Sequence, residues 1–259
     1  MPERTPSARH GAVTIGVLFP ELLGTYGDGG NAVVLAQRLR WRGVGAEVVE
    51  VGVGEPVPGS CDIYLMGGGE DGPQSLAAHE LRAGGVLPRA VDGGAVVLAV
   101  CAGYQLLGRD FLGPDGSAYA GLGLLDCVTT RGQGPRRVGE LVVEADAGLG
   151  LPSLTGYENH AGVTTLGPTA QPLGRVVVGH GNDAGQGTEG VVAGRVVGTY
   201  LHGPVLARNP GLADLMLSWV VGALGPVDDR EVEALRAERI ATARRSRSAA
   251  GRGWSRRAR

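Results

Sequence analysis

The chain has 259 residues, a formal net charge of −2 at pH 7 and 43% hydrophobic residues. This length and apolar content suffice for one large domain with a full core, and the near-neutral balance argues against a polyanionic partner for the main body. No stretch reaches the roughly 20 apolar residues of a membrane span, and no secretory signal follows the N-terminus, so the sequence predicts a soluble cytoplasmic protein. Three cysteines without CxxC spacing predict neither a disulfide framework nor a metal site.

The first half of the chain alternates short apolar runs with helical patterns. Strands are predicted at 13–19, 46–51, 63–66 and 95–100, and helices at 32–42, at 74–83 and after residue 101. Runs that are apolar throughout are typical of strands buried on both faces of a parallel sheet. The alternation therefore predicts an α/β fold with a doubly wound, mostly parallel sheet flanked by helices.

The second half is richer in strand patterns. Strands are predicted within 127–130, 139–144, 154–164, 175–179, 190–193 and 196–201, followed by a helix at 210–224. We therefore expect a disordered N-terminus at 1–12, one domain at 13–225 and a tail at 226–259 that is partly helical or disordered.

Beyond Glu238 the tail has no acidic residue, but it has eight arginines, namely Arg239, Arg244, Arg245, Arg247, Arg252, Arg256, Arg257 and Arg259. Such a composition is typical of a solvated tail. Contact with anionic lipid headgroups or nucleic acid is the alternative.

The most informative stretch is the apolar run 95–100, which stops at Cys101 and continues through Ala102 and Gly103 into a helical pattern. Small residues beside the cysteine permit a tight strand-to-helix turn. Such an elbow presents a nucleophile at the carboxyl edge of the sheet, and a helix N-terminus favours the thiolate form. The stretch predicts a nucleophilic Cys101, with a buried structural cysteine as the alternative.

A glycine turn, 67–69, follows the strand at 63–66. Backbone N–H groups of Gly68 or Gly69 could form half of an oxyanion hole, and the N–H of Ala102 the other half. A merely flexible turn is the alternative.

A second glycine-rich loop, 23–31, lacks both common phosphate-binding motifs. We expect it to shape a nearby site, with Asp28 and Asn31 as polar contacts. Turn and helix-cap roles are the alternative for both residues.

The five histidines can be sorted by position. His10 lies in the N-terminal tail, His79 on a helix and His180 in a loop, which leaves His160 and His202. His202 follows a β-rich run about a hundred residues after the elbow cysteine. Cysteine and histidine in this order suit nucleophilic acyl transfer, in which the imidazole takes the thiol proton.

Four motifs together resemble the class I (triad-type) glutamine amidotransferases, closest to their cobyric-acid-synthase-like branch. They are Gly-Gly-Gly-Glu at 67–70, Val-Cys-Ala-Gly-Tyr-Gln at 100–105, Gly-Tyr-Glu-Asn-His-Ala-Gly at 156–162 and Gly-Thr-Tyr-Leu-His-Gly-Pro at 198–204. The resemblance covers roughly residues 13 to 225 and implies a flavodoxin-like core. The segment Tyr-Gly-Asp-Gly-Gly-Asn at 26–31 and the free-standing length are similar to the glutaminase subunits of lipid II isoglutaminyl synthases.

The resemblance implies a mechanism. Cys101 would attack the side-chain amide of L-glutamine, and His202 would protonate the departing ammonia before water hydrolyses the thioester. Gln105 matches the family's substrate-holding glutamine, with helix-surface packing as the alternative. Arg136 or Arg137 could bind the substrate carboxylate through its fork geometry, and the sequence does not choose between them.

One position departs from the family pattern. Many members carry a glutamate two residues after the histidine, where this chain has Pro204. The site is then a dyad, or another group such as Glu158 orients His202.

By resemblance, ammonia would pass to a Mur-ligase-like subunit, MurT, in a heterodimer that amidates D-glutamate of lipid II to D-isoglutamine. No cofactor is expected in this chain; ATP and Mg would belong to the partner. Neither a nucleic-acid partner nor a bound metal is expected. The alternatives are a glutaminase for a corrinoid (cobyric acid type) synthetase, a stand-alone cysteine hydrolase, and a binding module without catalysis.

Overall fold

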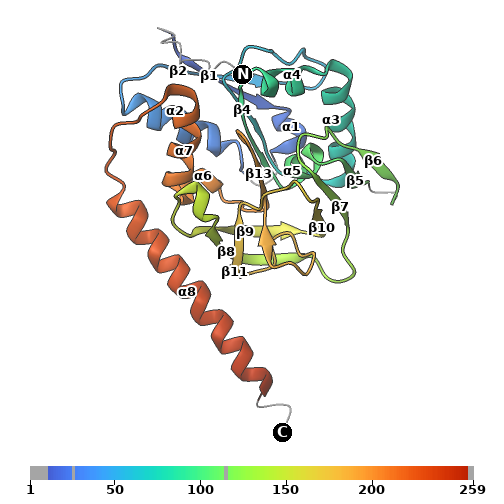
Figure 1. The fold of residues 1–259 in the computed structure, drawn as a ribbon, viewed down its shortest axis with the longest axis vertical. Helices are drawn as coiled ribbons and strands as arrows, with labels where there is room; N and C mark the ends of the chain where they lie inside the picture. The colour runs from blue at the N-terminus through green and yellow to red at the C-terminus, as the bar shows by residue number, and fades with distance from the viewer. Residues whose placement is uncertain (1–10, 25–26, 114–115, 256–259) are drawn as a thin grey trace.

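The computed structural model describes residues 11–24, 27–113 and 116–255, so most of the N-terminal segment expected to be disordered lies outside the described residues. A six-stranded sheet with the order β13-β14-β4-β3-β1-β2 forms the centre (Figure 1). Its strands are β1 (Val13–Leu18), β2 (Ala46–Val51), β3 (Ile63–Met66), β4 (Val96–Val100), β13 (Val191–Ala193) and β14 (Val196–Thr199). All neighbours run parallel except β13, which pairs antiparallel with β14. The predicted α/β class with a mostly parallel sheet is confirmed.

Helices cover both faces of this sheet. They are α1 (Pro20–Leu23), α2 (Gly30–Arg40), α3 (Asp71–Gly84), α4 (Val86–Asp92), α5 (Ala102–Leu107), α6 (Val205–Arg208) and α7 (Pro210–Val221). Helices α2, α6 and α7 contact one another on one side, and α3, α4 and α5 lie on the other side (Figure 1). Strand β4 is buried along its whole length because both of its faces are covered. Helix α4 was missed by the sequence patterns.

Two smaller sheets of four strands lie beside the central sheet, one at its right and the other below it in Figure 1. One has the order β10-β7-β5-β6, with β5 (Asp110–Leu112), β6 (Ala118–Ala120), β7 (Cys127–Arg131) and β10 (Gly162–Leu166). The other has the order β12-β11-β8-β9, with β8 (Arg137–Ala145), β9 (Leu154–His160), β11 (Gly174–Val178) and β12 (Thr188–Glu189). A 3₁₀ turn, η1 (Ala147–Leu149), joins β8 to β9.

The C-terminal segment forms one long helix, α8 (Arg230–Ser255), where the sequence left a choice between partial helix and disorder. It contacts β8, β9 and β11 and then extends away from the body (Figure 1). None of the helices within the described ranges combines the length and apolar character that crossing a membrane requires.

The pairing of β4 with β14 brings distant parts of the chain together. The two strands are parallel, with Thr199 in register with Val100. Because parallel strands end at the same edge of a sheet, the residues that follow them meet there. Cys101 follows β4, and His202 lies three positions beyond β14.

Candidate functional site

Cys101 has the backbone conformation of a nucleophile elbow. Its φ is 52° and its ψ is −107°, a combination that L-residues rarely adopt. The conformation is stabilised on both sides, since Cys101 N–H donates to Thr199 O at 2.8 Å and Gln105 N–H donates to Cys101 O at 3.0 Å. A Cβ at Gly103 would lie 2.8 Å from Met66 Cβ, so glycine is required for α5 to pack on the end of β3.

His202 is held through both its backbone and its ring. Its N–H donates to Tyr157 O at 2.8 Å, and Tyr157 N–H donates to His202 O at 3.1 Å, so β9 fixes the main chain. Its Nδ1 lies 3.1 Å from Asp28 Oδ2. His202 and Asp28 are 1% and 3% exposed, so this contact is shielded from solvent.

The surroundings favour the imidazolium form of His202. Burial acts to lower the pKa of His202, but hydrogen bonds and charges from Asp28 and Cys101 outweigh burial and raise it to about 9. Because Nδ1 contacts Asp28, Nε2 is the ring nitrogen left for the interaction with Cys101. A protonated His202 can therefore interact with Asp28 and with Cys101 at the same time.

The carboxylate in contact with the His202 ring is Asp28, and Glu158, which the sequence offered as one alternative to a dyad, contacts His180 instead. A Cβ at Gly30 would lie 2.5 Å from Pro204 Cγ, so the start of α2 packs directly on Pro204. This packing brings Asp28, two residues earlier, against the imidazole. Pro204, the residue that departs from the family pattern, is thus the one against which the start of α2 packs.

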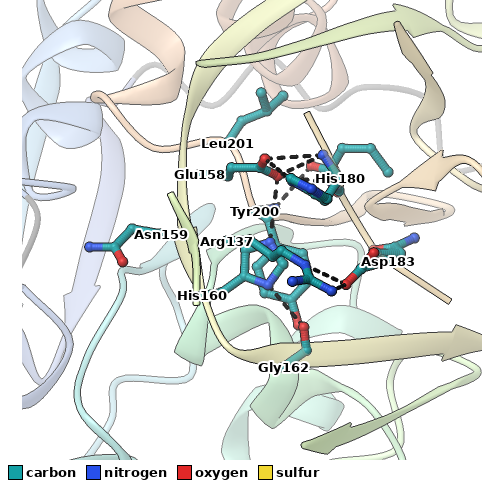
Figure 2. Close-up of polar contacts among 12 residues, drawn as sticks. Arg137, Glu158, Asn159, His160, Gly162, His180, Asp183, Tyr200 and Leu201 are labelled. Carbon is teal, nitrogen blue, oxygen red and sulfur yellow. Dashed lines mark hydrogen bonds and ion pairs between the residues drawn. The ribbon is translucent and has the colours of Figure 1, made fainter. Parts of the chain in front are cut away.

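Glu158 lies in a different cluster, shown in Figure 2. Its carboxylate contacts His180 Nδ1 at 2.8 Å and accepts the backbone N–H groups of His180 and Gly181 at 3.0 and 2.9 Å. His160 Nε2 lies 3.6 Å away. Burial acts to raise the pKa of Glu158, but the hydrogen bonds from these two histidines and two N–H groups lower it, so Glu158 is anionic and ties β9 to the loop after β11.

The glycine turn is a packing requirement as well as a candidate oxyanion site. A Cβ at Gly67 would lie 2.1 Å from Leu23 O, so the turn presses on the end of α1. Gly68 N–H donates to Asp28 Oδ2 at 2.9 Å, which makes it a support for the carboxylate and corrects its expected oxyanion role. Gly69 and Ala102 remain as candidate donors, since both line a cavity beside Cys101.

This cavity is an open cleft of about 650 Å³. Cys101 lines the cleft, although the residue as a whole is only 4% exposed. Gln105, Arg136 and His160 also line it. The cleft therefore joins the elbow, one predicted arginine and one of the two histidines that the sequence singled out.

The structure distinguishes the two candidate arginines. Arg136 lines the cleft and donates to the side chain and backbone oxygens of Asn159. Arg137 points elsewhere: its Nε lies 2.6 Å from Asp183 Oδ2, and its Nη1 donates to Pro135 O at 2.9 Å. The structure favours Arg136 in the choice that the sequence left open, because Arg136 lines the cleft and Asp183 holds the Arg137 guanidinium elsewhere. Arg131 lines the cleft as well.

The sequence analysis did not identify Gln74 and Tyr200 as polar residues of the site. It singled out His160 but did not predict that this residue lines the cleft. A signal was present in β9, where Glu158 and His160 share the buried face of an alternating strand. Asn31 supports the site from α2, since its Oδ1 accepts the N–H of Leu206 at 3.0 Å. Within the described part of the chain, no group of three or more histidine, cysteine, aspartate or glutamate residues could hold a metal ion.

Comparisons with known proteins agree with this geometry. Residues 14–210 match the family model described as the CobB/CobQ-like glutamine amidotransferase domain. The chain is 35% identical over 224 residues to the lipid II isoglutaminyl synthase (glutamine-hydrolyzing) subunit GatD of Staphylococcus aureus, covering 85% of this chain and 90% of that protein. It is 34% identical to the GatD subunit of Streptococcus pneumoniae, covering 78% of this chain and 77% of that protein.

Two further similarities are more partial. Cobyric acid synthase of Pelotomaculum thermopropionicum is 33% identical over 84% of this chain, but the match spans only 42% of that protein. A crystal structure of a glutamine amidotransferase superposes with a TM-score of 0.54 at 22% identity, covering 80% of this chain and 98% of that chain. This last similarity supports the fold alone.

Proposed function

The chain belongs to the CobB/CobQ-like glutamine amidotransferase domain family, and from this premise we propose that it is the glutaminase subunit of a lipid II isoglutaminyl synthase. It would hydrolyse L-glutamine through a thioester on Cys101 and deliver ammonia to a Mur-ligase-like partner, MurT. The observation that carries the hydrolytic part is the strained Cys101 lining a cleft beside the His202–Asp28 pair.

The proposed chemistry balances with the groups present. The Cys101 thiolate attacks the carboxamide carbon, and the resulting oxyanion accepts hydrogen bonds from the N–H groups of Gly69 and Ala102. The C–N bond then breaks, and the leaving nitrogen takes a proton from the His202 imidazolium to depart as ammonia. Water gives a proton back to His202 and attacks the thioester, which releases glutamate and restores the thiolate.

The α-carboxylate of glutamine would be bound by Arg136, since an arginine fork suits a carboxylate. We predict that Arg136→Ala raises the KM for glutamine about tenfold or more and changes kcat less. Arg137→Ala should leave the KM within about threefold, because that side chain binds Asp183 and not the cleft. Steady-state kinetics of both variants checks this, and equal KM values for the two would contradict the placement of Arg136.

The partner and acceptor are proposed from the two GatD relatives, which match over most of their own lengths. We infer that the partner uses ATP and Mg to activate the α-carboxyl of D-glutamate in lipid II, and that ammonia converts it to D-isoglutamine. This chain would contribute no cofactor. The heterodimer would act in the cytoplasm, where ATP is available and thiols such as Cys101 stay reduced.

Copurification from the native cell tests the partner. An affinity-tagged chain should retain a Mur-ligase-like protein, and that protein should raise glutamine turnover. The second candidate function is a glutaminase for a corrinoid synthetase, and the similarity to cobyric acid synthases supports it. Retention of a corrinoid synthetase in place of the Mur-ligase-like protein would favour this second function. Full turnover by the chain alone, with no retained protein, would replace the proposal with a stand-alone hydrolase.

A further inference from the structure

Tyr200 lies between the end of β14 and His202, and the chemistry described so far gives it no role. The residue is fully buried, with 0% of its surface exposed. Its hydroxyl lies 3.1 Å from Gln105 Nε2 and 2.7 Å from Thr164 Oγ1. A buried tyrosine therefore contacts the side chain that is expected to hold the substrate.

The donor and the acceptor are fixed in the chain of contacts from Gln74 through Gln105 to Tyr200. Gln74 Nε2 lies 3.3 Å from Ala102 O, and a backbone carbonyl can only accept, so this atom is the amide nitrogen. Gln74 Nε2 also donates to Gln105 Oε1 at 2.8 Å, which places Gln105 Nε2 against the Tyr200 hydroxyl. Because an amide nitrogen cannot accept, the Tyr200 oxygen accepts this hydrogen bond, whereas either hydroxyl can be the donor between Tyr200 and Thr164.

The Tyr200 ring has little freedom to move. It stacks on His160 with centroids 3.8 Å apart and rings inclined by 16°, an arrangement visible in Figure 2. Tyr104 packs edge-on against it at 5.2 Å. The backbone N–H of Tyr200 donates to the buried carboxylate of Glu189 at 2.9 Å. The hydroxyl is thus a fixed acceptor, and it fixes Gln105 in turn.

We propose that Tyr200 is a positioning residue for glutamine binding, whose hydroxyl holds the Gln105 amide with its nitrogen turned to the substrate cleft. The proposal rests on the proposed function and deepens it. Gln105 Nε2 has two N–H groups; one donates to Tyr200, and the second is available to a ligand in the cleft that Gln105 lines. Without the hydroxyl, a partly buried donor lacks its acceptor and the amide loses its preferred orientation.

Replacing Tyr200 by phenylalanine tests this role, because the ring and its stacking on His160 remain. We expect Tyr200→Phe to raise the KM for glutamine about tenfold and to keep kcat within about twofold, since positioning affects binding more than the chemical step. Tyr104→Phe is the matched control. Its hydroxyl is equally buried but lies 3.2 Å from Asn182 Oδ1 and does not contact Gln105, so its KM should stay within about twofold of wild type.

A double-mutant cycle identifies the route of the effect. In a Gln105→Ala background, Tyr200→Phe should produce no further rise in KM, because the group that it positions is gone. The rate of Cys101 alkylation by iodoacetamide should be the same in all variants, which shows that each is folded around an intact elbow.

The proposal is overturned if Tyr200→Phe leaves KM unchanged, if it raises KM equally without Gln105, or if Tyr104→Phe has the same effect. An unchanged KM in Gln105→Ala overturns it as well. Failure of the proposed function is distinct, since the wild-type protein would then not hydrolyse glutamine even with its partner.

Discussion

Cys101→Ala should reduce glutamine hydrolysis by at least about a thousandfold, because the thioester cannot form and the remaining groups only orient and polarise the substrate. Alanine is smaller than cysteine and has the same backbone preferences, so the elbow and the packing of α5 on β3 should persist. The variant should therefore keep its thermal midpoint within a few degrees and still bind the partner. Glutaminase assays, thermal unfolding and copurification measure these three results.

The other two cysteines provide the matched controls. Cys61 and Cys127 are buried and free, and burial raises the pKa of both thiols, that of Cys127 to about 12. Cys61→Ala should keep turnover within about twofold. A glutamine-analogue electrophile should label Cys101 alone, as peptide mass spectrometry can show. Turnover retained by Cys101→Ala, or equal labelling of all three thiols, would exclude the proposed mechanism.

Local patterns were sufficient to predict the central sheet and the tight turn at Cys101. The apolar run before Cys101 could only be a strand buried on both faces, and the small residues after it required a tight turn. His202 could be placed at a sheet edge because it follows a β-rich run, and the parallel pairing of β14 with β4 makes this the edge where Cys101 lies. These are constraints that act within a few residues or through one parallel pairing.

The remaining site residues depend on contacts that no local pattern encodes. Asp28 reaches His202 because Gly30 packs on Pro204, a contact between residues 174 positions apart in sequence number. Gly68 and Gly69 are neighbouring glycines that the sequence cannot tell apart. The structure distinguishes them because the N–H of Gly68 donates to the Asp28 carboxylate. Arg136 and Arg137 are likewise adjacent, and the ion pair with Asp183 on a distant loop decides which one lines the cleft.

Asp28→Asn should lower kcat/KM for glutamine roughly a hundredfold at pH 8 and shift its alkaline limb to lower pH. Asparagine keeps a similar shape but removes the charge that, with Cys101, raises the pKa of His202 to about 9. With that pKa lowered, His202 is neutral at pH 8 and cannot supply the proton that the leaving ammonia requires. The loss should shrink toward pH 6, where the imidazolium forms again. A pH profile of kcat/KM checks both statements.

Glu158→Gln is the matched control for this pH profile, because it neutralises another buried carboxylate that binds histidine but lies against His180. It should leave the alkaline limb near its wild-type position, whereas a shift equal to that of Asp28→Asn would return the orienting role to Glu158.

The pH dependence of stability gives an independent readout of the His202–Asp28 contact. A histidine whose pKa is raised on folding stabilises the protein fully below its unfolded value of 6.5 and loses that contribution as pH rises through about 9. The wild-type thermal midpoint should therefore fall as the pH rises through this window. The thermal midpoint of Asp28→Asn should fall less, because without the Asp28 carboxylate folding raises the pKa of His202 less.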